Sequence, residues 1–139
     1  MVFIAEGIQK FLYPVLRGLG RFESIGIPYP EFSANMVGGF EVICGLLILI
    51  GLFTRYASIP LIVIMIFAII TTKIPILFGV EMMGFSLREL EYYGLLSMIH
   101  ESRNDMAMLI GSIFLLLKGG GMYSLDLKLF GPAGKETYN

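Results

Sequence analysis

The chain has no tryptophan, one cysteine, one histidine and few charged residues. Because a single cysteine has no partner within its own chain, Cys44 excludes an internal disulfide and a CxxC redox or zinc motif. His100 has no second histidine at ligand spacing, so no metal site is predicted. Lysines and arginines are scattered singly around a net charge of −1, which excludes the basic surface that nucleic-acid partners need.

Apolar residues make up most of what is present. Of the 139 residues, 56% are hydrophobic and 15% are charged, and the mean hydropathy is +0.80. A typical soluble domain has about 45–50% apolar and about 25% charged residues. Such a chain favours the lipid bilayer as its surroundings, and at about 20 residues per span it has room for at most four or five spans. We predict a single all-α domain over residues 1–139, a membrane-spanning helical bundle.

Five segments of the chain show helical patterning. In chain order they are residues 1–19, 35–53, 57–79, 86–100 and 104–118. The first is too short and too polar to span a membrane, and we interpret it as the remnant of a first helix whose start is missing. The second and third predict an antiparallel pair of spans joined by a polar turn over residues 54–56, with Ser33 or Asn35 as the first N-cap.

The last two segments differ in polarity. Residues 86–100 open with a capping-box pattern and carry apolar residues at helical spacing, which predicts an amphipathic helix on the membrane surface. Residues 104–118 predict the last span, which ends at the glycines of residues 119–121. Residues 122–139 are predicted to form a polar tail.

Charged side chains near the spans are the candidate functional residues, because each costs about 2.5–3.5 kcal/mol at the centre of a bilayer on insertion scales. The candidates for a polar interior are Glu41, Lys73, His100, Glu101, Arg103 and Asp105, with Glu6 and Lys10. Glu41 lies about two turns into its span and is expected to face the interior, either protonated or paired with a cation from this list. It is either a proton-transfer or ligand-binding group or half of a structural ion pair.

The run from His100 to Asp105 packs an imidazole, two carboxylates and a guanidinium into six residues. Acidic residues suit the first turn of a helix, so the run either marks the start of the last span or forms a proton-accepting or headgroup-binding site. Glu6 and Lys10 are four residues apart and fit an intrahelical ion pair as well as they fit a site. Both interpretations stay open for each group.

Several short motifs follow one another in a set order. They are Glu6-Gly7-Ile8-Gln9-Lys10-Phe11, Gly26-Ile27-Pro28, Glu41 with Gly45, Gly51-Leu52-Phe53-Thr54-Arg55, Thr72-Lys73-Ile74-Pro75, His100-Glu101-Ser102-Arg103-Asn104-Asp105, and Gly119-Gly120-Gly121 with Ser124-Leu125-Asp126. In this order they resemble the DoxX family, small membrane proteins with four transmembrane helices, over nearly the whole chain. Compared with that pattern, the first helix is truncated and the linker after the third segment is long.

The resemblance implies a membrane subunit or anchor of a quinone- or thiol-linked redox complex, because relatives include a subunit of a thiosulfate:quinone oxidoreductase. It implies a bacterial or archaeal plasma membrane, a soluble redox enzyme as partner, no covalent cofactor, and a quinone-accessible pocket built from Glu41, Lys73, His100 and Asp105. Whether the chain itself is an enzyme stays open. The alternatives are a non-enzymatic assembly or structural protein and a small transporter subunit. The partner could also be a second copy of the chain in a homo-oligomer. The long linker after the third segment is acidic, which favours placing the linker outside the cell and the tail in the cytoplasm.

Overall fold

The computed structural model describes residues 1–81, 87 and 90–131, and every regular element in this part of the chain is a helix. The elements are α1 (Val2–Leu12), α2 (Leu19–Ile25), α3 (Pro30–Ile50), α4 (Thr54–Ala68), the π-helix η1 (Ile69–Lys73), α5 (Ile74–Phe78), α6 (Leu95–Lys118) and α7 (Leu125–Phe130). The predicted all-α fold is confirmed.

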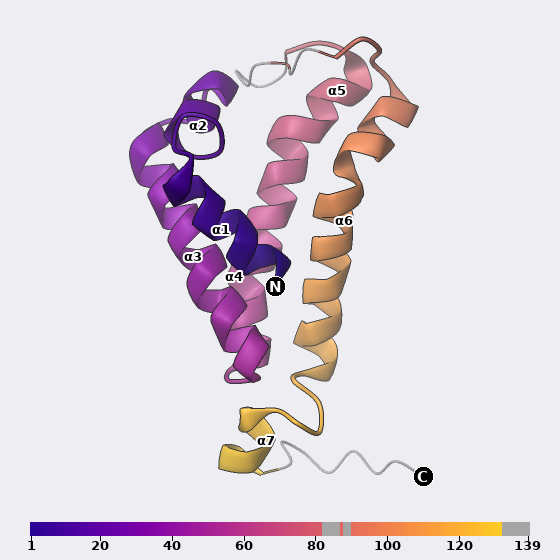
Figure 1. Cartoon of the computed structure of the whole chain (residues 1–139). Helices are drawn as coiled ribbons and strands as arrows, with labels where there is room; N and C mark the ends of the chain where they lie inside the picture. The colour runs from indigo at the N-terminus through magenta and orange to yellow at the C-terminus, as the bar shows by residue number, and fades with distance from the viewer. Residues whose placement is uncertain (82–86, 88–89, 132–139) are drawn as a thin grey trace.

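Three long segments form the body of the bundle (Figure 1). Helix α3 pairs with the continuous segment α4–η1–α5, and α6 packs against the same segment. The short helices α1 and α2 lie against α3, and α7 lies at the end where α3 turns into α4. Both Pro30–Ile50 and Thr54–Phe78 are long and apolar enough to cross a membrane. Their outer faces expose large apolar side chains, as a surface in contact with lipid requires.

Helix α3 begins earlier than its apolar pattern predicts. Pro30 occupies its first turn, where backbone N–H groups have no partner within the helix, so the missing N–H of proline costs no hydrogen bond. Tyr29 is the N-cap, with φ of 50°. Ser33 and Asn35 therefore lie inside the helix, and the prediction that one of them is the cap is wrong. The Ser33 hydroxyl instead donates to the carbonyl of Pro28 at 3.0 Å.

The α3–α4 turn lies before the residues predicted to form it. Gly51 ends α3 in the left-handed conformation with φ of 70°, and Phe53, with φ of 48°, precedes the first residue of α4. Thr54 already belongs to α4, so the predicted turn over residues 54–56 is wrong. Upstream, the stretch between α1 and α3, where no helix is predicted, contains α2.

Residues 95–100 of the predicted surface helix and the predicted last span form one helix in the structure, whereas residues 90–94, predicted as helical, are not. Helix α6 has 24 residues, begins after Gly94 and continues through the polar run at residues 100–105. The prediction used charge as the mark of a helix end, but no glycine or proline interrupts residues 95–110, and the polar side chains distribute over two faces of one helix. The capping-box pattern at residues 86–89 lies, apart from Leu87, outside the described residues.

The segment after α6 closes the tail-side end of the bundle. Asp126 accepts hydrogen bonds from the backbone N–H groups of Phe53, at 2.6 Å, and Thr54, at 2.9 Å. Its own N–H donates to the carbonyl of Gly51 at 2.9 Å. Arg55 in turn donates to the carbonyl of Leu117 at 3.2 Å, near the C-terminus of α6. Part of the predicted polar tail is therefore a structural cap for the α3–α4 turn.

Replacing Asp126 with Ala should lower the free energy of unfolding by about 1 kcal/mol, the usual effect of losing an N-cap acceptor. Thermal unfolding in detergent measures the effect. Lys128→Ala is the control, because Lys128 is an exposed residue of the same short helix. Equal stability of the two variants would show that the Asp126 carboxylate does not support the turn.

Candidate functional site

Helix α1 approaches α3 at a contact between glycines. Gly7 is buried, and a Cβ atom at this position would stand 2.8 Å from the carbonyl oxygen of Gly38. Gly38 and Gly45 lie three residues before and four residues after Glu41, so all three share one face of α3. Small residues let two helix backbones come close, as at many helix contacts in membranes. This contact places α1 directly over Glu41.

The close approach forms an ion pair in the middle of α3. The Lys10 Nζ atom lies 2.5 Å from Glu41 Oε2, and the two side chains are 13% and 2% exposed. Glu41 faces the interior, as predicted, and its cation is Lys10. The pairing therefore joins α1 to α3, and the Glu6–Lys10 pair within α1 does not form, because Glu6 instead lies 3.9 Å from Arg17.

A second ion pair joins η1 to α6. Lys73 Nζ lies 3.2 Å from Asp105 Oδ2, with Lys73 nearly fully buried. Lys73 ends a π-helical turn in which the N–H of Ile74 donates to the carbonyl of Ile69, five residues back. Pro75 follows, and a proline in a helix lacks an N–H and crowds the carbonyl four residues earlier, so the backbone widens at this point.

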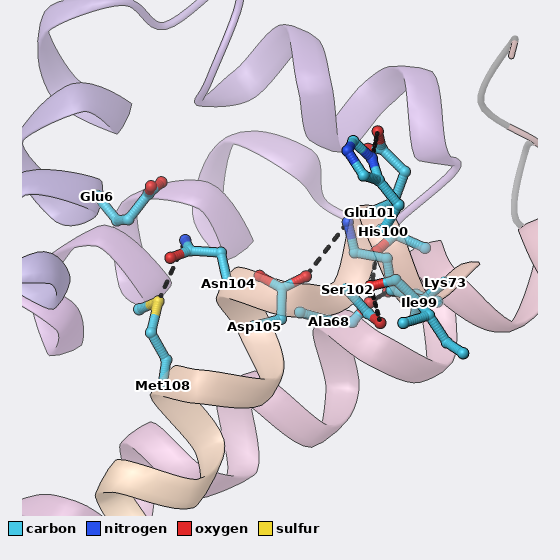
Figure 2. Close-up of polar contacts among 12 residues, drawn as sticks. Glu6, Ala68, Lys73, Ile99, His100, Glu101, Ser102, Asn104, Asp105 and Met108 are labelled. Carbon is cyan, nitrogen blue, oxygen red and sulfur yellow. Dashed lines mark hydrogen bonds and ion pairs between the residues drawn. The ribbon is translucent and has the colours of Figure 1, made fainter. Parts of the chain in front are cut away.

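The two pairs form one group of charges, which we call the ion-pair cluster: Glu6, Lys10, Glu41, Lys73 and Asp105. Glu6 and Asp105 both lie within electrostatic reach of the Glu41 carboxylate. Figure 2 shows Asp105 directed at Lys73, while Glu6 points from α1 toward the same helix, α6. The cluster thus draws on four elements, α1, α3, η1 and α6.

The family model for DoxX matches residues 1–74, which include Lys10, Glu41 and Lys73. The chain belongs to the DoxX family. It is also 46% identical over 129 residues to an uncharacterized membrane protein of Mycobacterium tuberculosis, an alignment that covers 93% of this chain and 75% of that protein. No solved structure matches. The membrane-spanning helical bundle predicted from composition is thereby confirmed for this DoxX protein.

Two of the predicted site residues lie outside the interior of the DoxX protein. His100 is 66% exposed and Arg103 is also exposed, whereas Asp105 pairs with Lys73 of η1 and Ser102 is buried. The reason is the single helix α6: residues three apart share a face, so His100 and Arg103 lie on one side and Ser102 and Asp105 on another. Glu101 lies at the border, with its Oε1 atom 3.8 Å from His100 Nδ1 (Figure 2).

Buried hydroxyl groups that the sequence did not single out also lie beside the cluster. Thr71 is 2% exposed and Ser102 is 3% exposed. The Thr71 hydroxyl donates to the carbonyl of Phe67 at 2.9 Å, and Ser102 donates to that of Ile99 at 3.3 Å. Both bond only to their own helix backbone in these contacts, so their position next to Lys73 and Asp105 is what distinguishes them. Their polarity extends that of the ion pairs.

The cluster offers two kinds of chemistry. Its three carboxylates can accept and release protons, and its two ammonium groups can donate hydrogen bonds to a carbonyl oxygen of a ligand. Among the residues that the structure describes, no group of three or more histidine, cysteine, aspartate or glutamate side chains is arranged to hold a metal ion. The arrangement suits a polar ligand or protons.

Removing one partner of the Lys10–Glu41 pair should cost much more than removing one partner of an exposed ion pair. Lys10→Met leaves the Glu41 charge buried without its partner and should lower the free energy of unfolding by about 3–5 kcal/mol. The double variant Lys10→Met/Glu41→Leu removes both charges and should regain most of that loss. Chemical denaturation in detergent compares the two, and a double variant as unstable as the single one would contradict this account.

The glycine contact predicts an opposite effect of alanine at two positions. Gly7→Ala should destabilise the bundle by about 1–3 kcal/mol, because the added methyl group meets the backbone of α3. Gly39→Ala is the matched control, since a Cβ there meets nothing within 4 Å and alanine favours the helix. The midpoints of thermal unfolding should fall for Gly7→Ala and stay level or rise for Gly39→Ala.

Proposed function

We propose that this DoxX protein is the membrane subunit of a redox complex and that the ion-pair cluster binds the headgroup of a quinone. The observation that carries the proposal is the burial of two lysine–carboxylate pairs inside an apolar bundle. Charged groups in a membrane interior are costly, and where they occur they usually mark ligand or proton pathways. Bilayer-dissolved quinones can approach such a site from the lipid.

The side chains of the cluster match the chemistry of a quinone headgroup. Lys10 and Lys73 can each donate a hydrogen bond to a quinone carbonyl oxygen, and Glu41 and Asp105 can pass protons to the same oxygens. Reduction to the quinol takes up two electrons and two protons. In the proposed complex a soluble oxidoreductase supplies the electrons, and the carboxyl groups supply the protons and regain them from water.

The proposed location is the plasma membrane of a bacterium or archaeon, with the tail in the cytoplasm. Positive charge does not separate the two ends, since Arg55, Lys118 and Lys128 lie on the tail side and Arg17, Arg21 and Arg103 toward the other among the described residues. The acidic character of the linker after α5 supports placing that linker outside and the tail inside. The soluble partner would dock on one of these two polar ends.

A structural or assembly role is the second candidate, and one observation favours it. Both buried lysines already have a carboxylate partner within the chain, so the cluster is satisfied without a ligand. In that case the charges only fix how the helices pack. The two roles differ in what loss of the Glu41 charge does to ligand binding.

Quinone binding by Glu41→Gln separates the roles. Glutamine keeps the size of the side chain but weakens charge-assisted hydrogen bonding, so the quinone Kd should rise roughly 10- to 100-fold. Glu31→Gln, at an exposed position in the first turn of α3, should bind as the unaltered protein does. Native mass spectrometry of protein extracted gently from its own membranes then reports whether a quinone or a redox enzyme is retained; a ligand-free homo-oligomer would favour the structural role.

A further inference from the structure

We infer that the ion-pair cluster exchanges protons with water at one face of the membrane only, the face formed by α2, α5 and the start of α6. A graded series of polar side chains leads from the cluster to that face, and a layer of apolar side chains separates it from the tail side. The use of these protons in quinone reduction rests on the proposed function. The one-sided path itself rests on the placement of the residues.

The positions of the charges along the helices give their depth. Glu41 precedes the end of α3 by nine residues, which is about 14 Å along the helix axis from the tail-side end. Asp105 precedes the end of α6 by 13 residues, about 20 Å. Lys73 follows the start of α4 by 19 residues, about 28 Å. The charges therefore rise stepwise from the middle of the bundle toward the α5 end.

From Glu41 to the side chains of α6, exposure increases in the same direction, whereas Lys73 on η1 stays 6% exposed. Glu41 is 2% exposed, Asp105 is 23% exposed, and His100, one turn closer to the α5 end of α6, is 66% exposed. Glu101 and the hydroxyl of Ser102 lie between the last two. Figure 2 shows this succession along α6, with Lys73 facing it from η1. Each neighbouring group can accept or donate a proton, so a few water molecules would complete a hydrogen-bonded path.

Apolar packing separates the cluster from the tail side. Cys44, Ala57 and Leu61 form a buried core there, and Phe3, Leu47 and Ile48 pack against it. Residues 42–50, 56–72 and 106–117 contain no charged side chain. Two buried hydroxyls at this depth are bonded within their own helices, Ser58 to the Thr54 carbonyl at 2.7 Å and Ser112 to the Met108 carbonyl at 2.9 Å. The buried Thr54 hydroxyl, at the tail-side end of α4, has no hydrogen-bond partner among the described residues. Protons lack a polar path through such a layer.

Two serines of α6 form a matched pair for testing the path. Ser102 and Ser112 are both nearly fully buried and both donate to their own helix backbone. Ser102 lies on the inferred path and Ser112 in the apolar layer. Cysteine is close in size to serine, so each replacement keeps the packing. The native Cys44 is first replaced with Ala, which leaves one thiol in each variant.

The thiol variants are placed in vesicles and treated from one side with [2-(trimethylammonium)ethyl] methanethiosulfonate, a hydrophilic reagent that does not cross membranes. Because the reaction needs a water-accessible thiolate, Ser102→Cys should react at least about tenfold faster than Ser112→Cys. His100→Cys marks the path-side face and Tyr123→Cys, at a 93% exposed position, marks the tail-side face. Ser102→Cys should react from the side that labels His100→Cys.

Equal rates for the two serine positions, no reaction at Ser102→Cys, or its reaction from the Tyr123→Cys side would each overturn the inference. Reaction after denaturation shows that every thiol is intact. The measurement needs no quinone, so the two proposals fail separately. One-sided labelling together with unchanged quinone binding in Glu41→Gln would support the one-sided proton path and reject the proposed quinone site at the ion-pair cluster.

Discussion

The arrangement of the N-terminal half of the bundle depends on the carboxylate of Glu41. A charge in the middle of an apolar 21-residue helix needs a cation nearby, and Lys10 supplies it from α1. To bring Lys10 that close, α1 must lie almost backbone to backbone against α3, and Gly7 and Gly38 make this approach sterically allowed. The electrostatic requirement and the glycine contact therefore explain one another.

The second ion pair also joins two helical segments through a buried charge, but it depends on a π-helical turn and not on a glycine contact. Lys73 reaches Asp105 from a π-helical turn ahead of Pro75. Such a turn holds one more residue than a turn of α-helix, and one residue of α-helix corresponds to a rotation of about 100°. The π-helical turn therefore changes the direction in which the Lys73 side chain leaves the helix. The two pairs join α1 to α3 and η1 to α6. The Asp105 carboxylate also interacts electrostatically with the Glu41 carboxylate, which links the two pairs. A polar interior is built while most of the surrounding surface stays apolar.

The sequence predicted the helical class, the two central spans and the interior position of Glu41, because a lone carboxylate in a long apolar run has few alternatives. It did not predict the length of α6, since charge was used to mark a helix end whereas His100 and Asp105 lie on different faces of one helix. The π-turn at Lys73 and the cap at Asp126 depend on backbone geometry and on a contact between distant segments. Pro75 after Lys73 and Ser124 before Leu125 mark these places in the sequence, but neither residue reveals the partner that its segment contacts.

The contact between Asp126 and the start of α4 also orders events during synthesis. The acceptor follows the N–H groups that it serves by 72 to 73 residues, so a ribosome adding about 5–20 residues per second needs roughly 4 to 15 seconds to reach it. During that interval the α3–α4 turn lacks this acceptor. A segment made later than the α3–α4 hairpin is thus the one that caps its turn.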